Sequence, residues 1–160
     1  MSATQWLDLF NQVVQQLPIT LIMIICALIL ATILGLILTI IRIKQVPYLS
    51  TCVRIYQSFM RSTPLLLQLF LVYFALPQFL LIFHININHF DRLFFIILAF
   101  SLHSAAYLSE VFRAGYLSVD YRQIEAGLSV GLSYPRILKD IIIPQALRNS
   151  IPNLTTQIIE

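Results

Sequence analysis

Three polar side chains share one face of an apolar segment near the middle of the chain. His103, Tyr107 and Glu110 follow one another at i, i+4 and i+7, the spacing that aligns side chains along one side of a helix. Polar groups inside a membrane segment are costly unless they face protein or water, and they commonly mark a solute pathway. These side chains are therefore candidates for lining a passage for a polar solute. The alternative for His103 is a hydrogen bond to a neighbouring helix.

Gln68 is a fourth candidate for this passage. It lies one helical turn inside another apolar segment, where its amide could contact a polar solute. An interhelical hydrogen bond is an equally good interpretation of the same position.

The histidines and serines of the chain give little support to enzyme chemistry. His84, His89 and His103 form no His–Glu–His helical motif of the kind that holds a catalytic zinc ion. Ser101 and Ser104 are too close to His103 in the sequence to form a persuasive nucleophile and base. We therefore expect no catalytic residue, no metal and no cofactor, and an intramembrane enzyme is the alternative from another class of function.

A second group of residues forms a spaced pattern in the charged segment 110–148. Its members are Glu125, Ala126 and Gly127, then Gly131 after three residues, Ile141 after nine more, and Pro144. The pattern predicts two short helices on either side of Gly131. The carboxylate of Glu125 is either a docking group or simply a solvated acid on the first helix.

The second of these short helices is amphipathic. Ser133 can act as its N-cap, and Pro135 suits its first turn, where a missing N–H costs little. An apolar stripe is formed by Ile137, Leu138, Ile141 and Ile142, and the opposite face by Arg136, Lys139 and Asp140. We expect the two helices to pack into one compact unit that can be moved as a rigid body.

The composition shows where these segments must lie. Hydrophobic residues make up 59% of the 160 residues and charged residues only 11%, and the mean hydropathy is +0.85. Soluble domains are typically about 25% charged, so the sequence predicts a membrane protein. The net charge is only +3, and no block of basic residues is present that would track phosphates, which argues against nucleic-acid binding.

Hydropathy predicts an all-α, polytopic bundle of transmembrane helices. The stretch 19–41 is uncharged over 23 residues, or about 34 Å of helix, enough to cross a hydrocarbon core of about 30 Å. Further spans are predicted at 64–83 and 93–109, with the first half of a fourth at 151–160. Pro77 should kink or break the outer end of the second span. Cys26 and Cys52 should lie at different depths as free thiols.

Basic residues predict the orientation of these spans. Arg42, Lys44, Arg54 and Arg61 lie between the first two spans without any acidic residue, which is typical of a cytoplasmic loop. The segment 1–18 lacks Lys and Arg and is expected outside the cytoplasm. The segment 110–148 then forms a second cytoplasmic loop, and the domain of spans covers residues 19–160.

The spacing from Glu125 to Pro144 resembles the EAA motif of the membrane permease subunits of bacterial ABC importers. Gly127 stands in place of the third motif residue, Ala, and Ile143 in place of Leu. The run from Arg61 to Phe70 and the run from Ala106 to Arg113 are similar to segments of the polar amino-acid branch of these permeases, which serves solutes such as histidine, glutamine and cystine.

This resemblance implies a type I importer permease fold of about five spans with the N-terminus outside. Residues 1–160 would then contain three spans and part of a fourth, without the C-terminal span or spans. The helix 125–131 would dock on a cytoplasmic ATPase subunit. Because no Walker-type G-x-x-x-x-G-K run is present, the partner ATPase would bind the ATP.

The resemblance also implies further partners. These are an extracytoplasmic amino-acid-binding protein, a second copy or a paralogue of the permease, and the lipid of the bacterial cytoplasmic membrane. A truncated permease that no longer transports is the alternative expectation.

Overall fold

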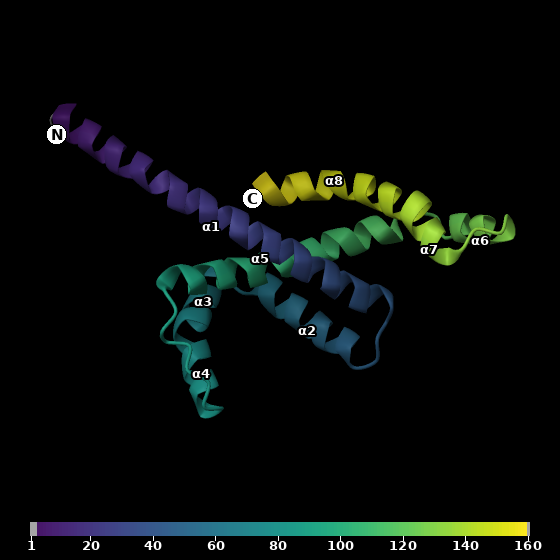
Figure 1. Cartoon of the computed structure of the whole chain (residues 1–160), viewed down its shortest axis with the longest axis horizontal. Coiled ribbons are helices and arrows are strands. Elements are labelled where there is room, and N and C mark those ends of the chain that lie inside the picture. The colour runs from purple at the N-terminus through teal and green to yellow at the C-terminus, as the bar shows by residue number, and fades with distance from the viewer. Residues whose placement is uncertain (1–2, 160) are drawn as a thin grey trace.

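The computed structural model describes residues 3–159, and every secondary-structure element in this range is helical (Figure 1). The elements are α1 (Ala3–Ile43), α2 (Leu49–Ser62), α3 (Leu65–Phe70), the π-helical turn η1 (Leu71–Ala75), α4 (Leu76–Ile82), α5 (Arg92–Leu117), α6 (Arg122–Ser129), α7 (Tyr134–Ile137), the π-helical turn η2 (Leu138–Ile142) and α8 (Ile143–Ile159). Three stretches are long and apolar enough to cross a membrane, namely Asp8–Ile43, Leu65–Ile82 and Arg92–Leu117. The predicted all-α transmembrane fold class is confirmed.

The first predicted span, 19–41, lies inside α1. This helix already begins at Ala3, so residues 3–18 continue it instead of forming a separate segment. The ends of the predicted segments 1–18 and 151–160, residues 1, 2 and 160, lie outside the described residues. Cys26 and Cys52 are both free thiols, as predicted.

Small residues allow α1 to pack closely on α5. Ala27, Ala31, Gly35 and Thr39 recur every four residues along α1. A Cβ atom on Gly35 would lie 3.2 Å from the Leu108 Cβ of α5. Small side chains at four-residue spacing are typical of helix pairs in membranes, where close van der Waals packing replaces the hydrophobic effect. The α1–α5 pair is thus the frame on which the other helices are arranged (Figure 1).

The second predicted span, 64–83, corresponds to α3, η1 and α4. Of the predicted kink or break at Pro77, the break is wrong, because the chain stays helical to Ile82. A π-helical turn ends at Ala75, two residues before Pro77, and the Leu76 N–H donates to the Leu71 carbonyl five residues earlier. A proline lacks an N–H and crowds the carbonyl four residues before it, here that of Tyr73, and the wider π turn accommodates both effects.

The third predicted span, 93–109, is longer in the structure. Helix α5 runs to Leu117, so the predicted loop 110–148 begins with two more turns of helix. Asp91 is the N-cap of this helix, and its carboxylate accepts a hydrogen bond of 2.7 Å from the Arg92 N–H. At the other end of this predicted loop, α7, η2 and α8 follow one another without interruption from Tyr134 to Ile159, so the fourth helix also starts inside it.

Candidate functional site

The two short helices predicted around Gly131 form one compact unit in the structure, the α6–α7 knob (residues 122–142). Ile124 of α6 is buried against Ile137 and Ile142, which are themselves almost fully buried. Leu138 and Ile141 pack against this cluster. The predicted apolar stripe is confirmed.

The opposite side of the second helix carries the predicted polar face. Arg136 and Asp140 are exposed and form an ion pair of 3.5 Å. Ser133 occupies the N-cap position of α7, and Pro135 lies in the first turn. The predicted side-chain cap is wrong, since the Ser133 hydroxyl forms no cap hydrogen bond.

Gly131 ends α6 in a left-handed backbone conformation, with φ at +82°. Its N–H donates to the Leu128 carbonyl at 3.0 Å, and the Leu132 N–H donates to the Gly127 carbonyl at 3.0 Å. These two bonds form a Schellman motif, which satisfies the last carbonyls of a helix and favours glycine in the left-handed position. A Cβ atom added to Gly131 would meet no neighbouring atom within 4 Å, so the backbone conformation and not space requires the glycine.

Gly127 is required for a different reason. A Cβ atom at this position would lie 2.8 Å from both Cγ1 and Cδ1 of Ile137. The buried isoleucine therefore lies directly on the backbone of α6. The EAA pattern has alanine at this position, whereas the glycine here leaves room for the large Ile137 side chain.

The outer face of the knob is open. Glu125 and Ala126 are exposed, and Glu125 forms no ion pair within the described part of the chain. Leu128 and Val130 are also exposed, the latter at 76%. A free carboxylate beside exposed apolar side chains is a surface suited to a protein partner.

The knob is fixed to the membrane helices through α8. The amides of Gln123 and Gln145 join α6 to α8 by two hydrogen bonds of 2.6 and 3.1 Å. Ile141 and Pro144 lie at the junction, in η2 and in the first turn of α8. As at Pro77, a π-helical turn ends two residues before the proline. Hydrogen bonds and a continuous helix therefore join α6 and α7 to α8.

Helix α8 in turn approaches α5 very closely at Gly115. A Cβ atom there would lie 2.0 Å from the Ser150 Oγ and 2.6 Å from the Ala146 carbonyl oxygen. The Asn149 side chain adds a hydrogen bond of 2.8 Å to the Ser118 hydroxyl. The knob, α8 and α5 are thus joined by consecutive packing and hydrogen-bond contacts.

The predicted passage residues separate into two groups. Gln68 and His103 form the interhelical hydrogen bond that the sequence left as the alternative, at 3.0 Å between Gln68 Oε1 and His103 Nδ1. Gln68 is only 2% exposed, and its amide also donates to the Met60 and Thr63 carbonyls at 2.7 and 2.8 Å. These two side chains therefore hold α3 against α5.

Tyr107 and Glu110 instead line a cavity of about 500 Å³ between α2 and α5. The guanidinium of Arg61 lies 5.8 Å from the centre of the Tyr107 ring, within cation–π range. Glu110 accepts from Arg42 at 3.1 Å and from Arg113 at 2.9 Å. The structure thus places an aromatic ring and an arginine-held carboxylate on one cavity wall, and it adds Arg61, which the sequence marked only as a basic residue of a cytoplasmic loop.

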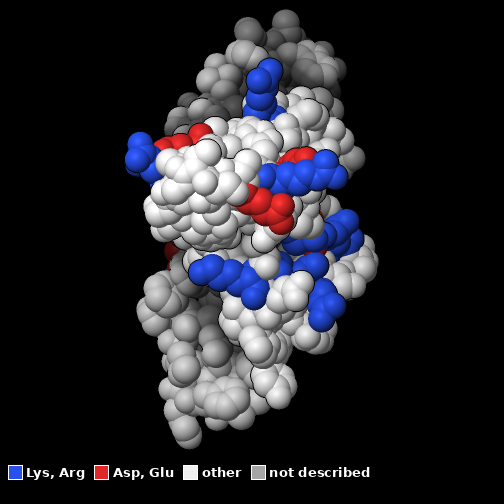
Figure 2. Space-filling model, turned by 90° about the vertical axis from the view of Figure 1, so that its right-hand side faces the viewer, with Lys and Arg blue, Asp and Glu red and all other residues white. Residues whose placement is uncertain are grey.

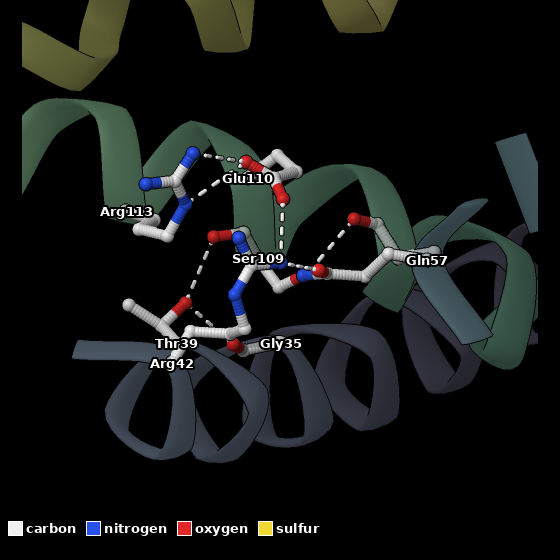
Figure 3. Close-up of polar contacts among 8 residues, drawn as sticks. Gly35, Thr39, Arg42, Gln57, Ser109, Glu110 and Arg113 are labelled. Atoms are coloured by element: carbon white, nitrogen blue, oxygen red, sulfur yellow. Dashed lines mark hydrogen bonds and ion pairs between the residues drawn. The ribbon is translucent and has the colours of Figure 1, made fainter. Parts of the chain in front are cut away.

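A buried polar network behind Glu110 was not predicted (Figure 3). Gln57 of α2 accepts a hydrogen bond from Arg42 and donates to the Ser109 hydroxyl at 2.7 Å. The Thr39 hydroxyl bonds to the Ser109 carbonyl at 3.0 Å, so α1, α2 and α5 meet here (Figure 3). The only sequence signal was the amphipathic pattern of α2, in which Gln57 shares a helix side with Arg54 and Arg61.

Comparison with known proteins identifies the family. Residues 31–160 match the profile of the family described as binding-protein-dependent transport system inner membrane component. The chain belongs to this family. The permease is 43% identical over 155 residues to the probable amino-acid permease protein YxeN of Bacillus subtilis, an alignment that covers 95% of this chain and 67% of YxeN.

Other relatives of the permease agree. It is 37% identical to the probable amino-acid ABC transporter permease protein PatM of Vibrio harveyi, with 94% of this chain and 69% of PatM covered. It is 38% identical to the arginine transport system permease protein ArtQ of Bacillus subtilis, with 92% and 64% covered. The permease spans about two thirds of the length of these relatives. These relatives are transport permeases and not enzymes, in agreement with the prediction from the sequence that this chain is not an enzyme.

A solved structure has the same fold. The crystal structure of an amino acid ABC transporter with histidines superposes on the permease with a TM-score of 0.80 at 28% sequence identity, over 99% of this chain and 71% of the other. The predicted likeness to amino-acid ABC importer permeases is confirmed.

Proposed function

We propose that this chain is the membrane subunit of an ABC importer that carries a polar amino acid across the cytoplasmic membrane, driven by ATP that a partner subunit binds and hydrolyses. The α6–α7 knob is the observation that carries the proposal. Its outer face presents Glu125 and Ala126, while its inner face is closed by Ile137. The amino-acid permeases among its relatives support the solute class.

The knob would act as the coupling element. Closure of an ATPase pair pushes on α6, whose shape is held by Gly127 and Gly131. The Gln123–Gln145 hydrogen bonds pass the movement to α8, past Ile141 and Pro144. Packed helices of this kind move as rigid bodies, so the push rocks α8 and α5 between two arrangements.

The orientation and the other partners belong to the same proposal. The α1–α2 turn and the knob lie at one end of the molecule, and Lys and Arg side chains are spread over that end with Asp and Glu between them (Figure 2). This charge distribution supports a cytoplasmic location for that end, with the N-terminus outside. An extracytoplasmic binding protein would deliver the amino acid, and a second permease copy or a paralogue would complete the passage.

Tyr107 and Glu110 also line a second cavity of about 250 Å³ on the α8 side of α5, with Asn153 on its wall, and the solute would pass there. Gln68 and His103 would shape the passage indirectly, because their hydrogen bond holds α3 against α5. ATP is held by the partner, and the permease itself needs no cofactor.

Affinity purification of the tagged 160-residue chain from bacterial membranes tests this function. The expected eluate contains an ABC ATPase subunit and an amino-acid-binding protein, identified by mass spectrometry. Gly131→Asp should abolish ATPase recovery while the chain remains in the membrane, because aspartate strains the left-handed turn and adds a charge at the docking face. Asn86→Asp, which adds the same charge in the exposed 83–91 connection, is the matched control. Equal ATPase recovery with Gly131→Asp would refute the coupling role.

Glu125→Gln separates charge from shape at the same surface. We expect ATPase binding to weaken by about tenfold, since a charged hydrogen bond at an interface contributes more than about 1.4 kcal/mol. Asp140→Asn removes the same charge from the polar side of the knob and should leave binding unchanged. Unchanged binding with Glu125→Gln, measured by titration of the purified ATPase, would mean that packing alone holds the interface.

A further inference from the structure

One face of α2 consists of hydrogen-bond donors. Arg54, Ser58, Arg61 and Ser62 follow at i, i+4, i+7 and i+8, so they lie along one side of the helix. All four line the cavity of about 500 Å³ between α2 and α5. The Ser62 hydroxyl donates to the Ser58 carbonyl at 2.6 Å, so the donors available on this wall are the two guanidinium groups and the Ser58 hydroxyl.

The positive charge of this wall is not neutralised. Glu110 is the one carboxylate among the described residues that line the cavity, and Arg42 and Arg113 already bind it. Arg54 donates to the Thr51 hydroxyl, and Arg61 contacts the Tyr107 ring. Neither arginine has an ion pair within residues 3–159. The cavity therefore favours an anion, and arginine forks suit the oxygens of a phosphate or a carboxylate.

The position of the cavity narrows the choice of anion. Arg42, on its wall, lies in the last turn of α1, where the first membrane span ends. The cavity thus lies at the depth of lipid headgroups, whichever way the chain is oriented. Basic pockets between transmembrane helices at this depth are known to hold anionic lipid headgroups.

An apolar strip lies beside the donor face. Ile55 and Phe59 are one turn apart on α2 and are exposed at 65% and 48%. An amphiphile could place its charged group in the cavity and an acyl chain along these two side chains. A free phosphate or an amino-acid carboxylate would use the cavity and leave the strip uncovered.

We propose that the cavity between α2 and α5 binds the phosphodiester headgroup of an anionic phospholipid. Arg54 and Arg61 donate to the phosphate oxygens, Ser58 adds a hydroxyl donor, and an acyl chain covers Ile55 and Phe59. The site would fix α2, and with it the Gln57 network, at the membrane boundary. This proposal does not depend on transport or on an ATPase partner, so it can fail while the proposed function holds.

The test is lipid binding to the purified full chain in a non-ionic detergent, followed by native mass spectrometry. The probes are dioctanoyl-phosphatidylglycerol and, as its zwitterionic counterpart, dioctanoyl-phosphatidylcholine. We expect tighter binding of phosphatidylglycerol to the parent chain. The double variant Arg54→Gln/Arg61→Gln should weaken that binding by about 25-fold, since each arginine near an anionic lipid surface contributes about a fivefold factor.

The matched control is Arg122→Gln/Arg136→Gln, which removes the same charge from exposed positions on the knob. It should bind phosphatidylglycerol as the parent does, and Arg54→Lys/Arg61→Lys should retain most of the binding because it keeps the charge. Equal binding of the two lipids by the parent, or equal loss in the control pair, would overturn the proposal. Displacement of the lipid by millimolar inorganic phosphate or by glutamate would also overturn it, and would assign the cavity to a free phosphate or to a solute carboxylate.

Discussion

Gly115→Ala tests the contact that joins the coupling knob to the membrane helices. The added Cβ would lie 2.0 Å from the Ser150 Oγ and 2.6 Å from the Ala146 carbonyl oxygen. The serine hydroxyl can rotate away, but the carbonyl belongs to the backbone of α8 and is fixed by its helix. We therefore expect α8 to move away from α5 and the free energy of unfolding to fall.

The size of this loss follows from two opposing contributions. Overpacking of a close contact costs about 1 to 3 kcal/mol, and a backbone clash belongs at the upper end of that range. Alanine in place of glycine returns up to about 1 kcal/mol of helix propensity. The net expectation is a loss of about 2 kcal/mol, which lowers the melting temperature of a chain of this size by about 4 to 8 °C.

The assay is thermal unfolding of the purified chain in detergent, followed by circular dichroism. Gly35→Ala is the matched control. Its Cβ would lie 3.2 Å from the Leu108 Cβ, and the nearest backbone atoms of α5 would be 3.4 Å away. Adding Ser150→Ala to Gly115→Ala should restore only part of the stability, since the contact with the Ala146 carbonyl persists. A Gly115→Ala chain as stable as the parent would refute the reasoning about this contact.

Two further predictions concern buried contacts elsewhere. Gln68→Leu should lower the free energy of unfolding by about 1 to 3 kcal/mol, because it leaves buried carbonyl groups without a donor. Gln78→Leu, at an exposed position, is the control in the same melting assay. Equal melting temperatures for both variants would contradict the buried role of Gln68. Gly127→Ala should loosen the knob, because the new Cβ would lie 2.8 Å from two carbon atoms of Ile137. Amide hydrogen exchange over residues 122–142 should then become faster, Ile137→Val should reverse part of the change, and an unchanged exchange rate would contradict the packing described for the knob.

The spans could be predicted because hydropathy is a local property of the chain. Each of the three stretches that can cross a membrane contains or matches a predicted span. The ends of the helices could not be predicted in the same way. Glu110 marks the predicted start of a loop, yet α5 continues past it, and Arg42, 68 residues away in the sequence, binds that carboxylate. A charge ends a hydrophobic run, but glutamate is itself a good helix former, so the helix can continue past it.

The prolines show a similar limit. The sequence predicts a kink or a break at Pro77 and makes no such prediction at Pro144. In the structure a π-helical turn precedes each of them and the helix goes on. Whether a proline breaks a helix or widens one turn depends on the packing of the flanking segments, which local preferences do not contain.

The knob of this permease could be inferred from the residues alone because it depends on neighbours in the chain. Ile124, Gly131 and Ile137 lie within fourteen residues, and their spacing sets the turn and the buried stripe. The cavity between α2 and α5 required the folded molecule. Its walls come from segments about 50 residues apart. The register of α2 against α5 brings Arg61 over Tyr107, and it follows from the close packing of α1 on α5 and from the Gln57 hydrogen bonds. Side-chain spacing along one helix is fixed by backbone geometry, whereas the register between helices is fixed by contacts that exist only after folding.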